Sequence, residues 1–157
     1  MSPTPDLISL ARSTAVQHSL DPALVCAVAE QESSWDPHAI RYEPAFRTRY
    51  VVPLALPPTE EVARSISWGL MQVMGQVARE HGFAGKFLSA LCDPATGLDI
   101  ACKVLAAKLS AAAGGHSPQL GSLSAGEPLL ARALALWNGG ANLHYAPEVL
   151  ARLSKYR

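Results

Sequence analysis

One apolar segment constrains the fold of this chain more than any other, because it predicts a core helix with a defined start. Asp21 supplies a side-chain oxygen at the N-cap position, and Pro22 follows at the first helical position. Val25, Val28 and Glu32 are spaced i, i+3 and i+7, so the acid shares one face with two branched apolar side chains. The pattern therefore predicts a helix that carries a carboxyl group on its apolar face.

Glu32 stands at the C-terminal end of this helix, where scarce water and the negative end of the helix dipole both disfavour ionisation. Both effects predict a raised pKa, as a general acid that works near neutral pH requires. Glu30 falls on the opposite side of the helix, where we expect a solvated acid. The alternative for Glu32 is an ordinary helix-end acid that points to solvent. The wider sequence context favours the general acid.

Two later blocks provide that context. The first reads Ser-Trp-Gly-Leu-Met-Gln at residues 67–72, and the second reads Ala-Leu-Trp-Asn-Gly-Gly at residues 135–140. Together with Glu32-Ser33, and in this order, they resemble the catalytic domain of soluble lytic transglycosylases and goose-type lysozymes over roughly residues 18 to 152. The resemblance implies a mainly α, α+β lysozyme-like fold. It also implies cleavage of the β-1,4 bond between N-acetylmuramic acid and N-acetylglucosamine in peptidoglycan.

The resemblance further implies candidate substrate-binding residues. Gln72 matches a glutamine that lines the family's cleft, which makes it a candidate sugar ligand. Many members have Ser directly before the glycine of this block, whereas this chain has Trp68 there and Ser67 one place earlier. The family usually has Tyr, with its hydroxyl near the catalytic glutamate, where Trp137 supplies a ring and an N–H donor. Asn138 matches the family pattern and is either a cleft residue or a helix C-cap.

Two reactions stay open for an acid at Glu32. In a transglycosylase the substrate's own acetamido group stabilises the anomeric carbon, and Glu32 then acts as a base on the 6-hydroxyl to close a 1,6-anhydro ring. In a lysozyme-type hydrolase a second carboxylate positions a water, and it lies about 6.5–9.5 Å from the acid when the reaction inverts. Glu43 is the first candidate for that second carboxylate, and Glu61 is the second candidate.

Residues 36–66 predict a flap beside the active-site cleft, either irregular or with a short strand or hairpin at residues 47–56. Aromatic rings and Arg side chains suit a sugar with ring faces and a lactyl carboxylate. The candidates for lining its subsites are Tyr42, Phe46, Arg41 and Arg47. The alternative is that three aromatics spaced four apart, Tyr42, Phe46 and Tyr50, fix a short helical turn against the core. Glu43 is either a second active-site carboxylate or one half of an ion pair with a nearby arginine.

The rest of the sequence predicts further helices in one catalytic domain that spans residues 1–157. Their expected ranges are 5–18, 67–80, 93–113, 127–138 and 146–155, with a flexible connection at residues 114–126. Core positions expected on these helices include Leu70, Met74, Leu136 and Trp137.

Composition narrows the function classes. Thirteen basic and thirteen acidic residues give a formal net charge of zero, which argues against a broad nucleic-acid-binding surface. The three cysteines have no metal-site spacing, and Cys26 is expected to be a small core residue. The five histidines form no zinc-site motif, so we expect neither a metal site nor a cofactor.

Peptidoglycan glycan strands are the expected partner of a monomeric protein. No stretch approaches the roughly 20 apolar residues that span a bilayer, so we expect no stable membrane insertion. The N-terminus lacks the basic and apolar regions of a secretory signal peptide. This suggests a phage-type endolysin that is made in the cytoplasm and reaches the cell wall after a holin opens the membrane. The alternative is a non-catalytic wall-binding or phage structural module with the same fold.

Overall fold

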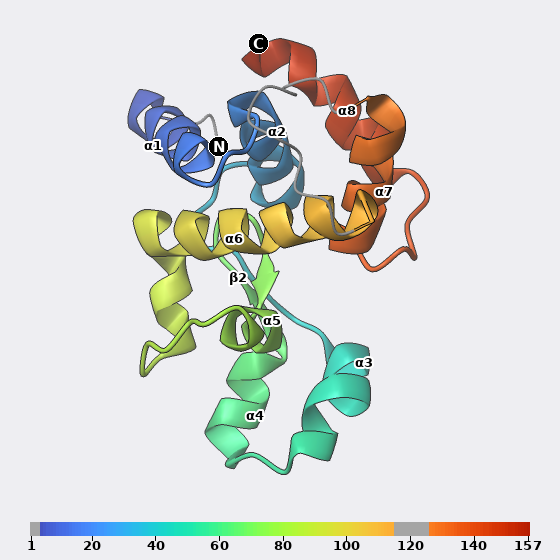
Figure 1. Cartoon of the computed structure of the whole chain (residues 1–157). Coiled ribbons are helices and arrows are strands. Elements are labelled where there is room, and N and C mark those ends of the chain that lie inside the picture. Colours follow the sequence, from blue (N-terminus) through green and yellow to red (C-terminus); the bar gives the residue numbers. More distant parts are fainter. Residues whose placement is uncertain (1–3, 115–125) are drawn as a thin grey trace.

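The computed structural model describes residues 4–114 and 126–157, so the expected connection at residues 114–126 lies mostly outside the described residues. Within them, helices surround a small three-stranded antiparallel sheet (Figure 1). This confirms the mainly α class with a minor β part. No helix in these two stretches is both long and apolar enough to cross a membrane.

Eight α-helices make up most of the described chain. Their bounds are α1 Pro5–Gln17, α2 Pro22–Ser33, α3 Pro44–Phe46, α4 Pro58–Arg64, α5 Gly75–Glu80, α6 Pro94–Ala112, α7 Glu127–Trp137 and α8 Tyr145–Tyr156. A π-helical turn, η1 (Arg47–Val51), and two 3-10 turns, η2 (Val52–Leu54) and η3 (Leu88–Cys92), complete the helical elements. The strands are β1 Ile40–Tyr42, β2 Ile66–Trp68 and β3 Val73–Met74.

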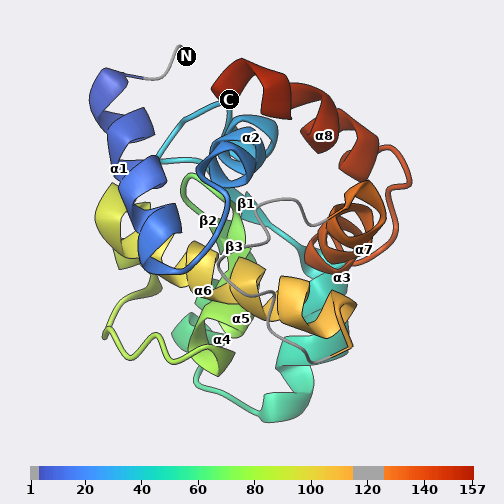
Figure 2. The same ribbon diagram turned by 45° about the horizontal axis from the view of Figure 1, so that its top comes forward.

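Helix α2 forms the centre of the core, between α1 and α8 (Figures 1 and 2). The Asp21 carboxylate accepts a hydrogen bond from the backbone N–H of Ala23 at 2.8 Å, which confirms the predicted N-cap. Every residue from Ala23 to Ala29 is buried, including Cys26. Glu30 was expected to be solvated, but it accepts hydrogen bonds from Lys155 and Tyr156 of α8, so it fastens α8 to α2.

The helix predicted at residues 67–80 is wrong in its first half. Residues 66–68 form β2, which pairs with both β1 and β3, and the helix begins only at Gly75. The chain reverses between the strands because Gly69 and Gln72 have left-handed backbones, with φ of +71° and +50°. Leu70 is buried as expected, whereas Met74 is only partly buried and lines a cleft.

The flap also differs from its prediction. No strand forms at residues 47–56; instead the chain turns helically through α3, η1 and η2, and the strand lies earlier, at residues 40–42. Pro44 and Pro53 stand in the first turns of α3 and η2, where the fixed φ of proline favours helical geometry. The rings of Phe46 and Tyr50 contact each other at a centroid distance of 4.9 Å, as the helical-turn alternative predicts for this pair. Tyr50 is 48% exposed, however, so its ring does not fix the turn against the core as that alternative also expects. Tyr42 lies outside that turn, in β1.

Helix α6 runs across the middle of the molecule, with α1, α2 and α8 on one side and α4 and α5 on the other (Figure 1). Asp93 caps it through the backbone N–H of Thr96 at 2.9 Å. Its buried face includes Leu98, Ala101, Cys102, Leu105 and Leu109. On α7 the prediction for Leu136 is wrong, because 45% of this side chain is exposed.

Backbone atoms of other segments lie close to the turn between β2 and β3. A Cβ atom at Gly69 would lie 2.5 Å from the carbonyl oxygen of Leu91. The Gly69 N–H donates to the carbonyl of Ala39 at 2.8 Å, and the Ser33 hydroxyl donates to the carbonyl of Leu70 at 2.8 Å. The turn is therefore bound both to the flap and to the end of α2.

We predict that Gly69→Ala lowers the free energy of unfolding by about 3 kcal/mol, the sum of a left-handed alanine and an overpacked contact. Gly140→Ala is the matched control, because Gly140 has a φ of +77° and no described atom within 4 Å of its Cβ position. It should lose only about 1 kcal/mol. Urea denaturation measures both values, and equal losses would contradict the close-approach explanation.

Candidate active site

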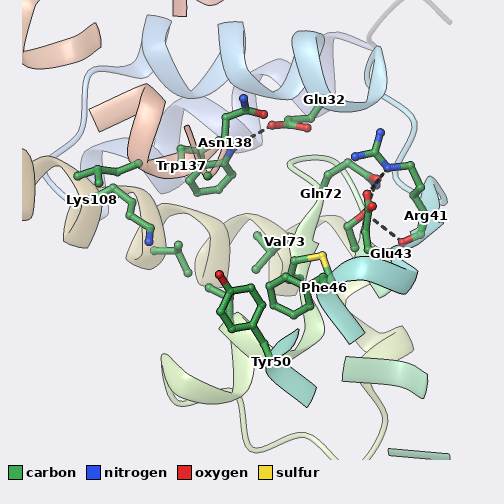
Figure 3. Close-up of a pocket in the computed structure, with 16 residues that line it drawn as sticks. Glu32, Arg41, Glu43, Phe46, Tyr50, Gln72, Val73, Lys108, Trp137 and Asn138 are labelled. Carbon is green, nitrogen blue, oxygen red and sulfur yellow. Dashed lines mark hydrogen bonds and ion pairs between the residues drawn. The ribbon is translucent and has the colours of Figure 1, made fainter. Parts of the chain in front are cut away.

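An open cleft of about 510 Å³ runs past the end of α2, within the size range of about 300–1,000 Å³ that is usual for ligand sites (Figure 3). Its walls come from α2, the flap, the sheet, α5, α6 and α7. The lining residues are Glu32, Arg41, Glu43, Phe46, Tyr50, Ser67, Gln72, Val73, Met74, Val77, Val104, Lys108, Leu136, Trp137, Asn138 and Gly139.

The Glu32 carboxyl group is held asymmetrically. The Trp137 indole N–H donates to Oε1 at 2.9 Å, and the Tyr145 hydroxyl donates to the same oxygen at 2.5 Å. Among the described residues no hydrogen bond is made to Oε2. A proton on the carboxyl group is therefore best placed on Oε2, because Oε1 already accepts from two donors.

Burial raises the pKa of Glu32 above its usual range, as its place on the apolar face predicted. The hydrogen bonds from Tyr145 and Trp137, and the positive charge of Arg41, act in the opposite direction without cancelling the burial effect. The pKa of Tyr145 is itself raised strongly, first by burial and then by the nearby Glu32 carboxylate. Tyr145 therefore stays a protonated donor throughout the neutral range.

Tyr145 is the site residue that the sequence analysis missed. Its side chain is only 4% exposed, and it supplies the phenolic hydroxyl that Trp137 lacks. It comes from the first residue of α8, one position before the start predicted for that helix. A signal was present, since Tyr145 precedes the buried Val149 by one helical turn.

Gln72 and Ser67 line the cleft, but their polar groups are largely occupied within the protein. Both amide hydrogens of Gln72 are donated to backbone, to the carbonyls of Ala39 at 2.9 Å and Gly69 at 3.0 Å. The Ser67 hydroxyl donates to the Gln72 amide oxygen at 2.8 Å. These contacts hold the turn between β2 and β3 in its left-handed geometry. The sugar-binding role predicted for the two residues stays a prediction.

The two candidate second carboxylates occupy different places. Glu43 lines the cleft and forms an ion pair with Arg41, which also lines it. Glu61 is not among the lining residues; it accepts a hydrogen bond from Arg47 Nε at 2.8 Å and so links α4 to η1 within the flap. Of the two, only Glu43 shares the cleft with Glu32.

The structure places Asn138 at the cleft and Tyr42 outside it. Asn138 is the C-cap of α7 and lines the cleft, so the two roles considered for it coincide. Its Nδ2 is buried without a described hydrogen-bond partner. Tyr42 is 46% exposed and is not a lining residue of the cleft. Among the residues that the structure describes, no three His, Cys, Asp or Glu side chains gather at a point that would hold a metal ion.

The amino-acid sequence also places the chain in a known family. The chain matches the family model described as "Transglycosylase SLT domain" over residues 9–146. The chain belongs to this family, whose lytic transglycosylases cleave peptidoglycan. Searches of curated proteins and of solved structures returned no significant match.

We predict that Tyr145→Phe shifts the pH profile of kcat/KM. Removing a hydrogen bond that favours the carboxylate raises the Glu32 pKa further, so the loss of activity at alkaline pH moves to higher pH. The maximal rate should fall by about tenfold, because the donor also stabilises the carboxylate formed as the proton leaves.

The matched control is Tyr156→Phe, on the same helix. Tyr156 contacts Glu30 and Trp35, not Glu32, so this change should leave the position of the alkaline limb unaltered. An alkaline limb that moves to lower pH in Tyr145→Phe would contradict the assigned role of the hydroxyl.

Proposed function

We propose that this protein is a lytic transglycosylase that cleaves the β-1,4 bond between N-acetylmuramic acid and N-acetylglucosamine. The observation that carries the proposal is the environment of Glu32, a partly buried acid with a raised pKa and one hydrogen-bonded oxygen at the edge of the cleft. Membership of a family of peptidoglycan lytic transglycosylases supports the same reaction.

In the first step the proton leaves Oε2 of Glu32 for the glycosidic oxygen. The bond between this oxygen and the anomeric carbon of the muramic residue breaks, and its electron pair stays with the leaving N-acetylglucosamine hydroxyl. Positive charge on the anomeric carbon is stabilised by the carbonyl oxygen of the substrate's own acetamido group. Trp137 and Tyr145 stabilise the new carboxylate through Oε1.

In the second step the carboxylate of Glu32 takes the proton from the 6-hydroxyl of the same muramic residue. The freed oxygen bonds to the anomeric carbon, which closes the 1,6-anhydro ring and returns Glu32 to its protonated form. No water is consumed, so a single carboxyl group serves as acid and then as base.

The surroundings of the other acids support this route over hydrolysis. Glu43 forms an ion pair with Arg41, so the carboxylate that would have to position and activate a water is already bound to a cation. Glu61 is engaged by Arg47 and does not line the cleft. The single-acid mechanism needs neither of them.

The products of purified peptidoglycan test the proposal by mass spectrometry. We expect fragments with 1,6-anhydro-muramic ends, each one water lighter than the hydrolysis product, and at least about 10²-fold fewer of them from Glu32→Gln in the same time. Ordinary reducing muramic ends would instead show a muramidase. Binding without release of any fragment by the wild-type protein would favour the non-catalytic wall-binding alternative.

We also predict that Glu43→Gln keeps the anhydro product and retains kcat within about tenfold, whereas Glu32→Gln lowers it by about 10²-fold or more. The reason is that only Glu32 transfers a proton in the single-acid route. Turnover of sugar fragments by chromatography measures both variants. Loss of activity in Glu43→Gln equal to that in Glu32→Gln would point to hydrolysis with Glu43 as the base.

A further inference from the structure

Lys108 of α6 lines the same cleft as Glu32. In Figure 3 its side chain extends into the same hollow as those of Trp137 and Tyr50. The residue is half-buried, so part of its side chain is open to solvent and to a ligand.

The charges that line the cleft do not cancel. Its described lining residues include two carboxyl groups, Glu32 and Glu43, and two cations, Arg41 and Lys108. Arg41 and Glu43 neutralise each other in an ion pair, and Glu32 is neutral in the protonated form that begins the reaction. With Glu32 protonated, Lys108 gives the cleft one net positive charge.

No described carboxylate forms an ion pair with Lys108. A cation on the wall of a ligand cleft, beside exposed apolar and aromatic groups, is suited to an anionic group on a ligand that also presents apolar ring faces. Tyr50 and Leu136 line the same cleft, and they are 48% and 45% exposed, so they offer such a surface to the same ligand.

We propose that Lys108 binds a carboxylate carried by the muramic residues of the substrate, and so makes the cleft prefer anionic glycan strands over uncharged ones. This inference rests on the proposed function, because peptidoglycan supplies the anion. Two sources have the same chemistry: the carboxylates of the stem peptide, and the lactyl carboxylate that is free where the stem is absent. The overall neutral charge of the chain means that attraction to an anionic strand depends on such local cations.

Binding to soluble glycan strands tests the inference without any turnover. The parent protein carries Glu32→Gln, so that it barely cleaves the strands. Three variants are made in this parent: Lys108→Gln, Lys108→Arg and the control Lys103→Gln. Lys103 is exposed on the same helix and does not line the cleft. Three ligands are compared by calorimetry: strands with stem peptides, strands stripped of stems by an amidase, and stem-bearing strands whose carboxylates are converted to amides.

We expect Lys108→Gln to weaken binding of a charged strand by about tenfold, the effect of one charge-assisted hydrogen bond. Lys108→Arg should restore most of the affinity, and Lys103→Gln should match the parent. On amidated strands Lys108→Gln and the parent should bind equally. A loss on stem-bearing strands alone identifies the stem carboxylates, and a loss on stripped strands identifies the lactyl carboxylate.

The inference is overturned if Lys108→Gln binds both charged strands as the parent does, or if the parent binds neither. It is also overturned if the variant loses the same factor on amidated strands, because Lys108 would then act through packing. The products of wild-type digestion test the proposed function separately. Anhydro products with unchanged binding by Lys108→Gln would reject this inference alone, and binding differences without products would reject the proposed reaction alone.

Discussion

The arrangement of this protein depends on keeping one carboxyl group out of water without leaving it unpaired. Burial at the end of α2 raises the free energy of the ionised Glu32, and two donors on a single oxygen offset part of that cost. Full compensation would give a permanently charged acid with no proton to transfer. No compensation would make the carboxylate too costly to form when the proton leaves. With two donors, the Glu32 carboxyl group can both hold a proton and exist as a carboxylate. A residue that acts first as an acid and then as a base needs both forms.

Three helices meet at this point, and each is held there by contacts outside the cleft. Helix α8 lies against α2 through Glu30 and through the buried hydrogen bond from Trp35 to Tyr156, at 2.9 Å, and so carries Tyr145 to the carboxyl group. Helix α7 delivers Trp137 from its last residue. Ser33, next to the acid, binds the carbonyl of Leu70 and joins the sheet side of the cleft to the same helix end. Core packing thus positions Glu32. Hydrogen bonds to backbone carbonyls position the sheet side of the cleft.

The sequence predicted those parts of the fold whose causes are local. The starts of α2 and α6 follow from Asp21 and Asp93, which cap the next turn, and the buried face of α6 follows from its 3.6-residue period.

The hairpin at residues 66–74 could not be predicted from such local signals. Its apolar residues also fit a helical stripe, and the deciding contacts of Gly69 and Gln72 are with Ala39, about thirty residues earlier. Tyr145 was missed for the same reason, because only the packing of α8 brings its hydroxyl to Glu32. Whether Glu43 or Glu61 would face the cleft likewise depended on the course of the flap, which local spacing does not determine.

The central claim is that Glu32 is protonated when the substrate binds, and a direct titration of its carboxyl carbon tests that claim. Carbon-13 NMR of glutamate-labelled protein, with Glu32→Gln used to assign the resonance, gives the pKa without reference to turnover. The burial of Glu32 predicts a midpoint clearly above the ordinary glutamate value of about 4.3. A midpoint at or below that value would mean that the hydrogen bonds from Trp137 and Tyr145 outweigh burial. Glu32 would then be ionised at neutral pH and unable to act as the acid.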